Sequence, residues 1–113
     1  MSLNKNFLSL DKFIHRALYG PKTGFYMKKN PFGDKGDFIT SPIISILFSE
    51  MLSVWTVAFW QNLKCPKYIN LIELGAGNGQ MMHDMINSFK SFPEFNKSCK
   101  FFILETSPFL KKI

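Results

Sequence analysis

A glycine-rich junction between a short apolar run and a helical pattern constrains this chain more than any other feature. Residues 68–80, YINLIELGAGNGQ, predict a buried strand, a tight loop and the start of a helix. Gly75 and Gly77 can adopt backbone angles that other residues disfavour, and a ligand can lie directly against their backbone. The free N–H groups at the helix start attract a carboxylate or a phosphate. The segment therefore predicts a ligand site.

The glycine spacing distinguishes two classes of ligand. A dinucleotide-binding loop has the spacing Gly-x-Gly-x-x-Gly, followed by an acidic residue about 20 positions later for the ribose. Here Gly75, Gly77 and Gly79 are one residue tighter, and the acidic Glu73 stands at the strand end. This spacing disfavours a dinucleotide-dependent oxidoreductase. It resembles motif I of the Rossmann-like methyltransferases, whose cofactor is S-adenosylmethionine (SAM).

A second apolar run, FFILE over residues 101–105, also ends in an acidic residue, Glu105. Methyltransferases with such a glycine loop place at this point the carboxylate that accepts both ribose hydroxyls of SAM. The alternative is that the glycines form an ordinary strand-to-helix turn and Glu105 is a solvated strand end. The two features together favour the cofactor site over that alternative.

The order of the expected elements defines the fold class. A strand from Ile69, a crossover helix over about 79–90, a return loop over 91–100 and a strand over 101–105 form a parallel β-α-β unit. We expect an α/β protein with a partial, truncated Rossmann-like SAM methyltransferase fold: N-terminal helices plus the first β-α-β unit. Residues 1–66 form the helical and loop region, and residues 67–113 form the incomplete SAM-binding unit.

The N-terminal region is expected to contain two helices joined by a loop. Ser9 can cap an amphipathic helix that stops before Gly20, and glycines and prolines over 21–36 indicate a surface loop. Thr40 or Ser41 can cap a second helix over about 42–63. That helix is apolar on most sides, so we expect several of its faces to be buried.

Composition excludes several classes of function. The net charge is +6, but the lysines are mostly scattered and Arg16 is the only arginine, which favours a solvated surface over nucleic-acid binding. Cys65 and Cys99 lack the spacing of a zinc site or a disulfide framework, and we expect no metal. Polar residues interrupt the apolar stretch over 43–60, so a buried helix is favoured over a membrane span. No leader pattern is evident, which favours the cytoplasm.

The residues resemble one particular family, the MidA-type SAM-dependent methyltransferases, over nearly the whole chain. The segments that carry the resemblance are ALY over 17–19, GFY over 24–26, GDFITSP over 36–42, ELGAGNG over 73–79 and LETSP over 104–108. The GDFITSP segment is the most diagnostic, because the glycine loop alone fits any methyltransferase. The loop departs from the family's usual residues at Ala76, Asn78 and Gln80.

The resemblance implies a cofactor site for SAM. The residues that it assigns to this site are Glu73, Gly75, Ala76, Gly77, Gly79, Glu105, Asp37, Thr40 and Ser41. The glycines hold the methionine part of SAM, and Glu105 holds the ribose. Asp37, Thr40 and Ser41 lie over the cofactor near the substrate entrance, although a helix cap and turn explain these three equally well. No catalytic residue is assigned.

The resemblance also implies an activity and partners. Mitochondrial members of the family assist assembly of respiratory complex I by methylating an arginine of one of its subunits, which implies a protein substrate and, in a eukaryote, the mitochondrial matrix. Family members are several times longer, so we expect an N-terminal fragment without independent activity, or half of a split enzyme that a second chain completes. The alternative is a non-catalytic module in which the helix over 42–63 and the strand edges bind another polypeptide.

Overall fold

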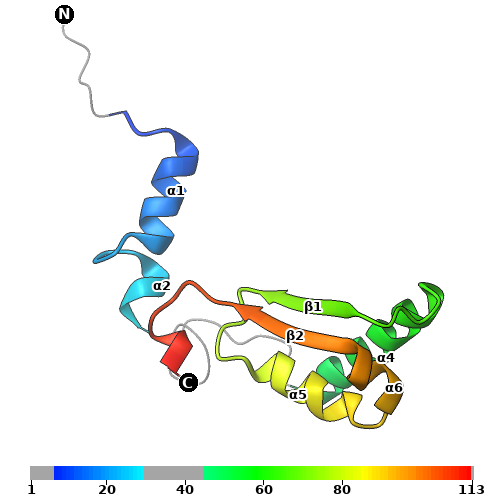
Figure 1. The fold of residues 1–113 in the computed structure, drawn as a ribbon. Helices are drawn as coiled ribbons and strands as arrows, with labels where there is room; N and C mark the ends of the chain where they lie inside the picture. The colour runs from blue at the N-terminus through cyan, green and yellow to red at the C-terminus, as the bar shows by residue number, and fades with distance from the viewer. Residues whose placement is uncertain (1–6, 30–44, 113) are drawn as a thin grey trace, which may run out of the picture.

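The computed structural model describes residues 7–29 and 45–112. Its elements are α1 (Leu10–Tyr19), α2 (Phe25–Lys28), α4 (Ile46–Asn62), β1 (Ile69–Leu74), α5 (Gln80–Phe89), α6 (Pro93–Ser98), β2 (Cys99–Leu104) and the 3-10 helix η1 (Leu110–Lys112). In Figure 1, α4, α5 and α6 gather beside the two strands, whereas α1 and α2 lie beyond the carboxyl ends of the strands. The molecule is elongated, with extents of 67, 33 and 21 Å.

The strands β1 and β2 pair in parallel, in a register that runs from Ile69 opposite Cys99 to Leu74 opposite Leu104. The helix α5 connects them, which confirms the predicted β-α-β unit. The first residue of the glycine loop continues this pairing, because the Gly75 N–H donates to the Leu104 carbonyl at 2.8 Å. The loop therefore begins where both strands end.

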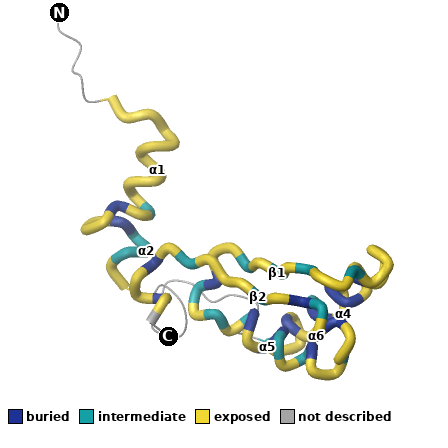
Figure 2. The backbone as a smooth tube through the Cα atoms, in the orientation of Figure 1, coloured by how far each residue is buried: buried dark blue, intermediate teal, exposed yellow. Residues whose placement is uncertain are grey.

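The core lies on one face of the sheet. Its buried side chains are Val57, Trp60, Met85, Phe89, Phe95 and Cys99. Phe89 is fully buried, and its ring centroid lies 4.7 Å from that of Phe95 and 5.5 Å from that of Phe101. Figure 2 shows buried positions concentrated where α4, α5 and α6 meet the sheet. Met85 of α5 belongs to this core, Met81 packs against it, and Met82 is also buried, as the sequence predicts.

Two expected loops contain short helices. The segment over 91–100 is not an irregular return loop, because α6 occupies Pro93–Ser98 and β2 starts at Cys99. Pro93 suits a first helical turn, and Phe95 anchors α6 in the core with 1% exposure. In the expected loop over 21–36, the described part holds the single turn of α2.

The helix α4 differs from its prediction in both its start and its orientation. It begins at Ile46 instead of Pro42, because Ser45 is extended with φ −149° and ψ 120°. The expected caps Thr40 and Ser41 lie outside the described residues. Its buried residues are Ser49, Ser53, Thr56, Val57 and Trp60. Most of its larger apolar side chains are exposed, including Ile46, Leu47, Phe48, Met51, Val54, Trp55 and Phe59.

The expectation that several faces of α4 are buried is therefore wrong. The hydroxyls of Ser53 and Thr56 each donate to the carbonyl four residues earlier, at 2.7 Å. These bonds satisfy the hydroxyls of Ser53 and Thr56, whereas the Ser49 hydroxyl is buried without a hydrogen-bond partner among the described residues. The helices α4 and α5 contact each other, and small residues form much of the buried face of α4. None of the helices within residues 7–29 and 45–112 is long and apolar enough to cross a bilayer.

Candidate functional site

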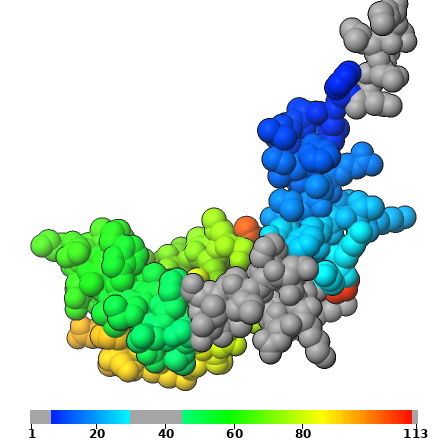
Figure 3. All heavy atoms as spheres, turned by 180° about the vertical axis from the view of Figure 1, so that it is seen from behind, coloured from blue at the N-terminus to red at the C-terminus, as the bar shows by residue number. Residues whose placement is uncertain are grey.

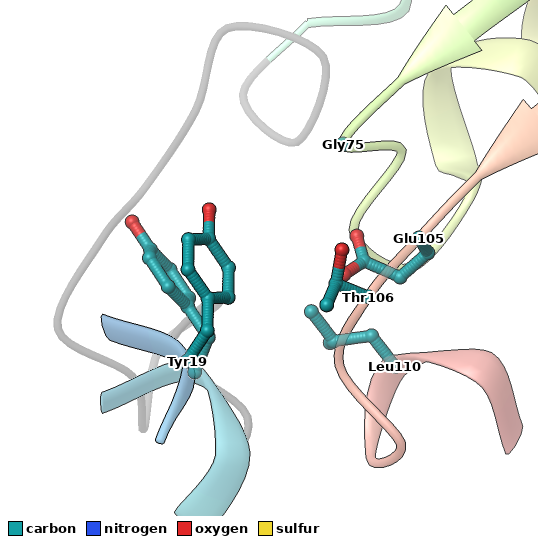
Figure 4. A pocket seen from close by; sticks show the side chains of 6 residues that line it. Tyr19, Gly75, Glu105, Thr106 and Leu110 are labelled. Carbon is teal, nitrogen blue, oxygen red and sulfur yellow. The ribbon is translucent and has the colours of Figure 1, made fainter. Parts of the chain in front are cut away.

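A small pocket opens at the carboxyl ends of both strands. It has a volume of about 170 Å³ and is lined by Tyr19, Tyr26, Gly75, Glu105, Thr106 and Leu110. Figure 4 shows the side chains around it, with Gly75 coming from the loop after β1 and Glu105 from the end of β2. Ligands of open α/β sheets bind in the crevice outside the carboxyl ends of the strands. This pocket is therefore the candidate site.

The glycine loop has the backbone conformation that the sequence predicts. Gly75, Gly77 and Gly79 have φ values of 69°, 61° and 76°. These values lie in the left-handed region, where a side chain costs roughly 1–2 kcal/mol per residue. A Cβ added at Gly75 meets no heavy atom within 4 Å, so this position borders open space. The loop thus leaves room for a ligand against its backbone.

Glu105 joins the two strand ends. Its Oε2 accepts a hydrogen bond from the Gly77 N–H at 2.8 Å, and its Oε1 accepts one from the Ser107 N–H at 2.7 Å. A carboxylate offers about four lone-pair positions, so these two bonds leave about one on each oxygen. The carboxylate is thereby fixed in place and can still accept two hydroxyl groups.

Glu73 and Ala76 lie away from this pocket. Glu73 lines a separate groove of about 300 Å³ between α4, β1 and α5, and Ala76 is buried. Burial raises the pKa of the Glu73 carboxyl, and a hydrogen bond from the Met82 backbone lowers the pKa to a smaller extent. Its Oε2 is buried without a hydrogen-bond partner among the described residues.

The remaining predicted site residues divide into two groups. Gly79 borders another cavity, of about 390 Å³, on the flank of the loop and of β2, together with Gly77 and Glu105. Asp37, Thr40 and Ser41 lie outside the described residues. The structure therefore brings Gly75 and Glu105 together at the pocket, and Gly77 borders the neighbouring cavity and donates to the Glu105 carboxylate.

The N-terminal helices supply one wall of the pocket, which the sequence did not predict. The Ser107 hydroxyl donates to the Tyr26 carbonyl at 2.5 Å, and Ser107 is fully buried. Figure 3 shows the spheres of α2 against the C-terminal residues, which agrees with this bond. Tyr19 and Tyr26 belong to segments that carry the family resemblance. Nothing local in the sequence indicates a contact with residues some 80 positions away.

The other reactive side chains do not converge. Within residues 7–29 and 45–112, no group of three or more His, Cys, Asp or Glu side chains could hold a metal ion. His15 and His83 are exposed, and Cys65 and Cys99 are free thiols. The chemistry that the described residues offer is therefore centred on the loop backbone and Glu105.

Comparison with known proteins agrees with this geometry. Residues 51–113, which include the glycine loop and Glu105, match a protein-family model described as "Putative S-adenosyl-L-methionine-dependent methyltransferase". The chain belongs to this family. Membership confirms the predicted family and the predicted fold class, a partial α/β Rossmann-like methyltransferase fold.

Curated relatives extend the match into the N-terminal region. The chain is 36% identical over 108 residues to "Protein arginine methyltransferase NDUFAF7, mitochondrial" of Xenopus laevis, covering 94% of the chain and 25% of that protein. It is 38% identical over 104 residues to the Drosophila melanogaster homolog, covering 89% and 23%. The human protein is 33% identical over 92 residues. The chain thus spans about a quarter of the length of these curated relatives.

Proposed function

We propose that the pocket at the strand ends is the SAM-binding part of a protein arginine methyltransferase. The observation that carries this proposal is the Glu105 carboxylate, fixed by Gly77 and Ser107 with lone pairs left on both oxygens. Glu105 would accept the ribose hydroxyls, and the backbone of Gly75 and Gly77 would hold the amino-acid end. SAM, when bound, supplies an electrophilic methyl group.

The other predicted residues have supporting roles in this proposal. Because Glu73 lies in the groove and accepts a hydrogen bond from the Met82 backbone, it would hold the start of α5 and would not contact the cofactor directly. Ala76 and Gly79 would maintain the loop, whose turn is closed by a 2.9 Å hydrogen bond from the Gly79 N–H to the Ala76 carbonyl. Asp37, Thr40 and Ser41 would lie over the cofactor near the substrate entrance.

The acceptor in this proposal is an arginine of a protein. The printed names of the relatives support it, because they are protein arginine methyltransferases and carry the word mitochondrial. The MidA-type resemblance suggests a respiratory complex I subunit as the substrate. The corresponding location is the mitochondrial matrix in a eukaryote and the cytoplasm in a bacterium.

We further propose that residues 1–113 alone do not transfer methyl groups. Transfer requires that donor and acceptor be held in near-attack geometry, and the described residues enclose only a small open pocket. One sheet face also exposes Ile72, Leu74, Phe102 and Leu104, whereas parallel sheets are normally covered on both faces. A further segment or a second chain would complete the fold. Transfer of labelled methyl groups by the purified chain would refute this proposal.

Calorimetric titration with S-adenosylhomocysteine (SAH) tests the cofactor site. We expect saturable binding that Gly77→Val abolishes, because Gly77 has φ 61° and its N–H binds Glu105. Ala58→Val is the matched control: it adds the same kind of side chain at an exposed position of α4. A folded wild-type chain that does not bind SAH would contradict the proposal.

A second candidate function is a non-catalytic interaction module. The exposed Leu47, Met51 and Trp55 on α4 favour it, because large exposed apolar patches mark interaction sites. Size-exclusion chromatography with light scattering separates the alternatives. A discrete complex supports the module, and a soluble monomer counts against it.

A further inference from the structure

Two tyrosines, Tyr19 and Tyr26, form an aromatic wall of the pocket. Tyr19 ends α1 and Tyr26 lies in α2. Their rings are stacked, with centroids 5.6 Å apart and an interplanar angle of 25°. Figure 4 shows Tyr19 across the pocket from Glu105, Thr106 and Leu110, and Tyr26 also lines this pocket. Tyr19 retains 36% exposure, so a ligand can reach the wall.

The wall is held in a defined position. The bond from Ser107 to the Tyr26 carbonyl links α2 to the residues that follow Glu105. The turn between α1 and α2 is tight, because a Cβ on Gly24 would lie 2.4 Å from the Gly20 nitrogen. Phe25 packs edge-on against Tyr26, at 5.2 Å and 86°. These contacts therefore hold the tyrosine rings in a fixed position relative to the Glu105 carboxylate.

The pocket has the chemistry of a cation site. Of the six described residues that line it, Glu105 is the one that carries a formal charge, and that charge is negative. The faces of aromatic rings attract cations within about 6 Å of the ring centroid. An aromatic wall opposite a carboxylate therefore favours an organic cation over a neutral group or an anion.

The volume of the pocket limits what it can hold. At about 170 Å³ it is smaller than the roughly 300–1,000 Å³ typical of sites for whole drug-sized ligands. It suits one functional group of a ligand whose other parts lie elsewhere. A sulfonium centre and a guanidinium head are both cations of suitable size.

We propose that Tyr19 and Tyr26 form a cation-binding wall that recognises a positively charged group of the methyl-transfer reaction, the SAM sulfonium or the acceptor guanidinium. This inference rests on the proposed cofactor site. If the group is the sulfonium, the wall distinguishes SAM from SAH, because the two differ by the methyl group and its positive charge. If the group is the guanidinium, the wall selects the arginine of the acceptor.

The test measures dissociation constants for SAM and SAH. We expect the wild-type chain to bind SAM roughly threefold to thirtyfold more tightly than SAH, the range of a cation–π contact. The double variant Tyr19→Leu/Tyr26→Leu should lose this preference and retain SAH binding. The matched control Tyr19→Phe/Tyr26→Phe keeps the ring faces and should keep the preference.

A second arm identifies the source of the cation. Acetyl-arginine amide is titrated into the SAH-saturated proteins. The wall binds the guanidinium if wild type and the Phe variant bind acetyl-arginine amide and the Leu variant does not. In that case, the ratio of the SAM and SAH dissociation constants should be the same in all three proteins. Ser107→Ala is an independent variant that releases α2 without changing either ring, and it should weaken the same cation preference as the Leu variant.

The outcomes separate this inference from the proposed function. If wild type binds SAH and the Leu variant changes neither the SAM affinity nor the arginine affinity, the proposed cation-binding role of the tyrosines is wrong. The proposed cofactor site would still hold. No binding of SAM or SAH to the folded chain would overturn both. A preference for SAM, or binding of arginine, that the Phe variant keeps and the Leu variant loses would support the proposed cation-binding role of the tyrosines.

Discussion

The helices α4 and α5 pack against each other but bury different mixtures of residues. On α5, Met82, Met85 and Phe89 face the core, and His83 and Asn87 face solvent. On α4, small and hydroxyl-bearing residues form much of the buried face, and larger apolar side chains such as Trp55 are exposed. Apolar spacing predicts the buried face only when polar residues mark the opposite face. In a helix that is apolar on most sides, small residues mark the close contact.

The two helices also differ in their position relative to the candidate pocket. The helix α5 begins directly after the glycine loop, so its packing fixes the position of Gly77 and of the pocket. The residues of α4 line the groove beside Glu73 but not the pocket at the strand ends. In the proposed function, cofactor binding therefore belongs to the α5 side, and the outer face of α4 is an exposed surface.

The largest expected effect is on the α5 side of the core. Phe89→Ala should lower the free energy of unfolding by about 3–5 kcal/mol, because Phe89 is fully buried among aromatic rings. Urea denaturation followed by tryptophan fluorescence measures the loss. Phe59→Ala on α4, where Phe59 is 48% exposed, is the control and should cost about 1 kcal/mol or less. Equal losses would contradict the inference that the large apolar side chains of α5 are buried in the core and those of α4 are not.

A smaller effect tests the small-residue contact of α4. Ser53→Leu should destabilise the protein by about 1–3 kcal/mol through overpacking, although leucine is more hydrophobic. The neighbouring Val54 is exposed, so Val54→Leu should be close to neutral in the same denaturation experiment. A stabilising Ser53→Leu substitution would show that α4 does not pack closely through this face.

The ends of the two helices differ as well. After α4, Lys64 and Cys65 have φ values of 65° and 53°, whereas Lys90 after α5 has φ −59°. Cys65→Gly should therefore raise the free energy of unfolding by about 1 kcal/mol, since glycine adopts this conformation without strain. Lys90→Gly has no such strain to relieve and should not stabilise. Thermal unfolding of both variants provides the measurement, and a stabilised Lys90→Gly would contradict this explanation.

The smallest effect concerns pH and the groove between the helices. The pKa of Glu73 is raised above its ordinary value of 4.5, so the folded chain binds more protons than the unfolded chain between these two pKa values. Stability should fall as pH rises through that window. Glu73→Gln removes this loss, so it should be more stable than wild type at pH 7, with the advantage shrinking below about pH 4.5. If the difference in melting temperature between Glu73→Gln and wild type is the same at pH 4.5 and pH 7, ionisation of Glu73 does not lower the stability.

Local patterns predict part of this molecule. The apolar run before Gly75 predicts β1, the helical pattern after the glycines predicts α5, and the acidic end of the FFILE run predicts where Glu105 lies. The helix α6 was missed because it is short and Phe95 alone anchors it in the core. The tyrosine wall was missed because the hydrogen bond between Ser107 and Tyr26 depends on tertiary packing and not on local propensity.

The proposed function requires that the pocket at the strand ends bind the cofactor. Two-dimensional amide NMR of the chain during titration with SAH measures this binding residue by residue. We predict that the Gly77 and Ser107 amides, which donate to Glu105, shift saturably with SAH, while the Leu47 and Met51 amides on α4 stay in place. Shifts confined to α4, or no shift at Gly77 and Ser107 at saturating SAH, would contradict the claim.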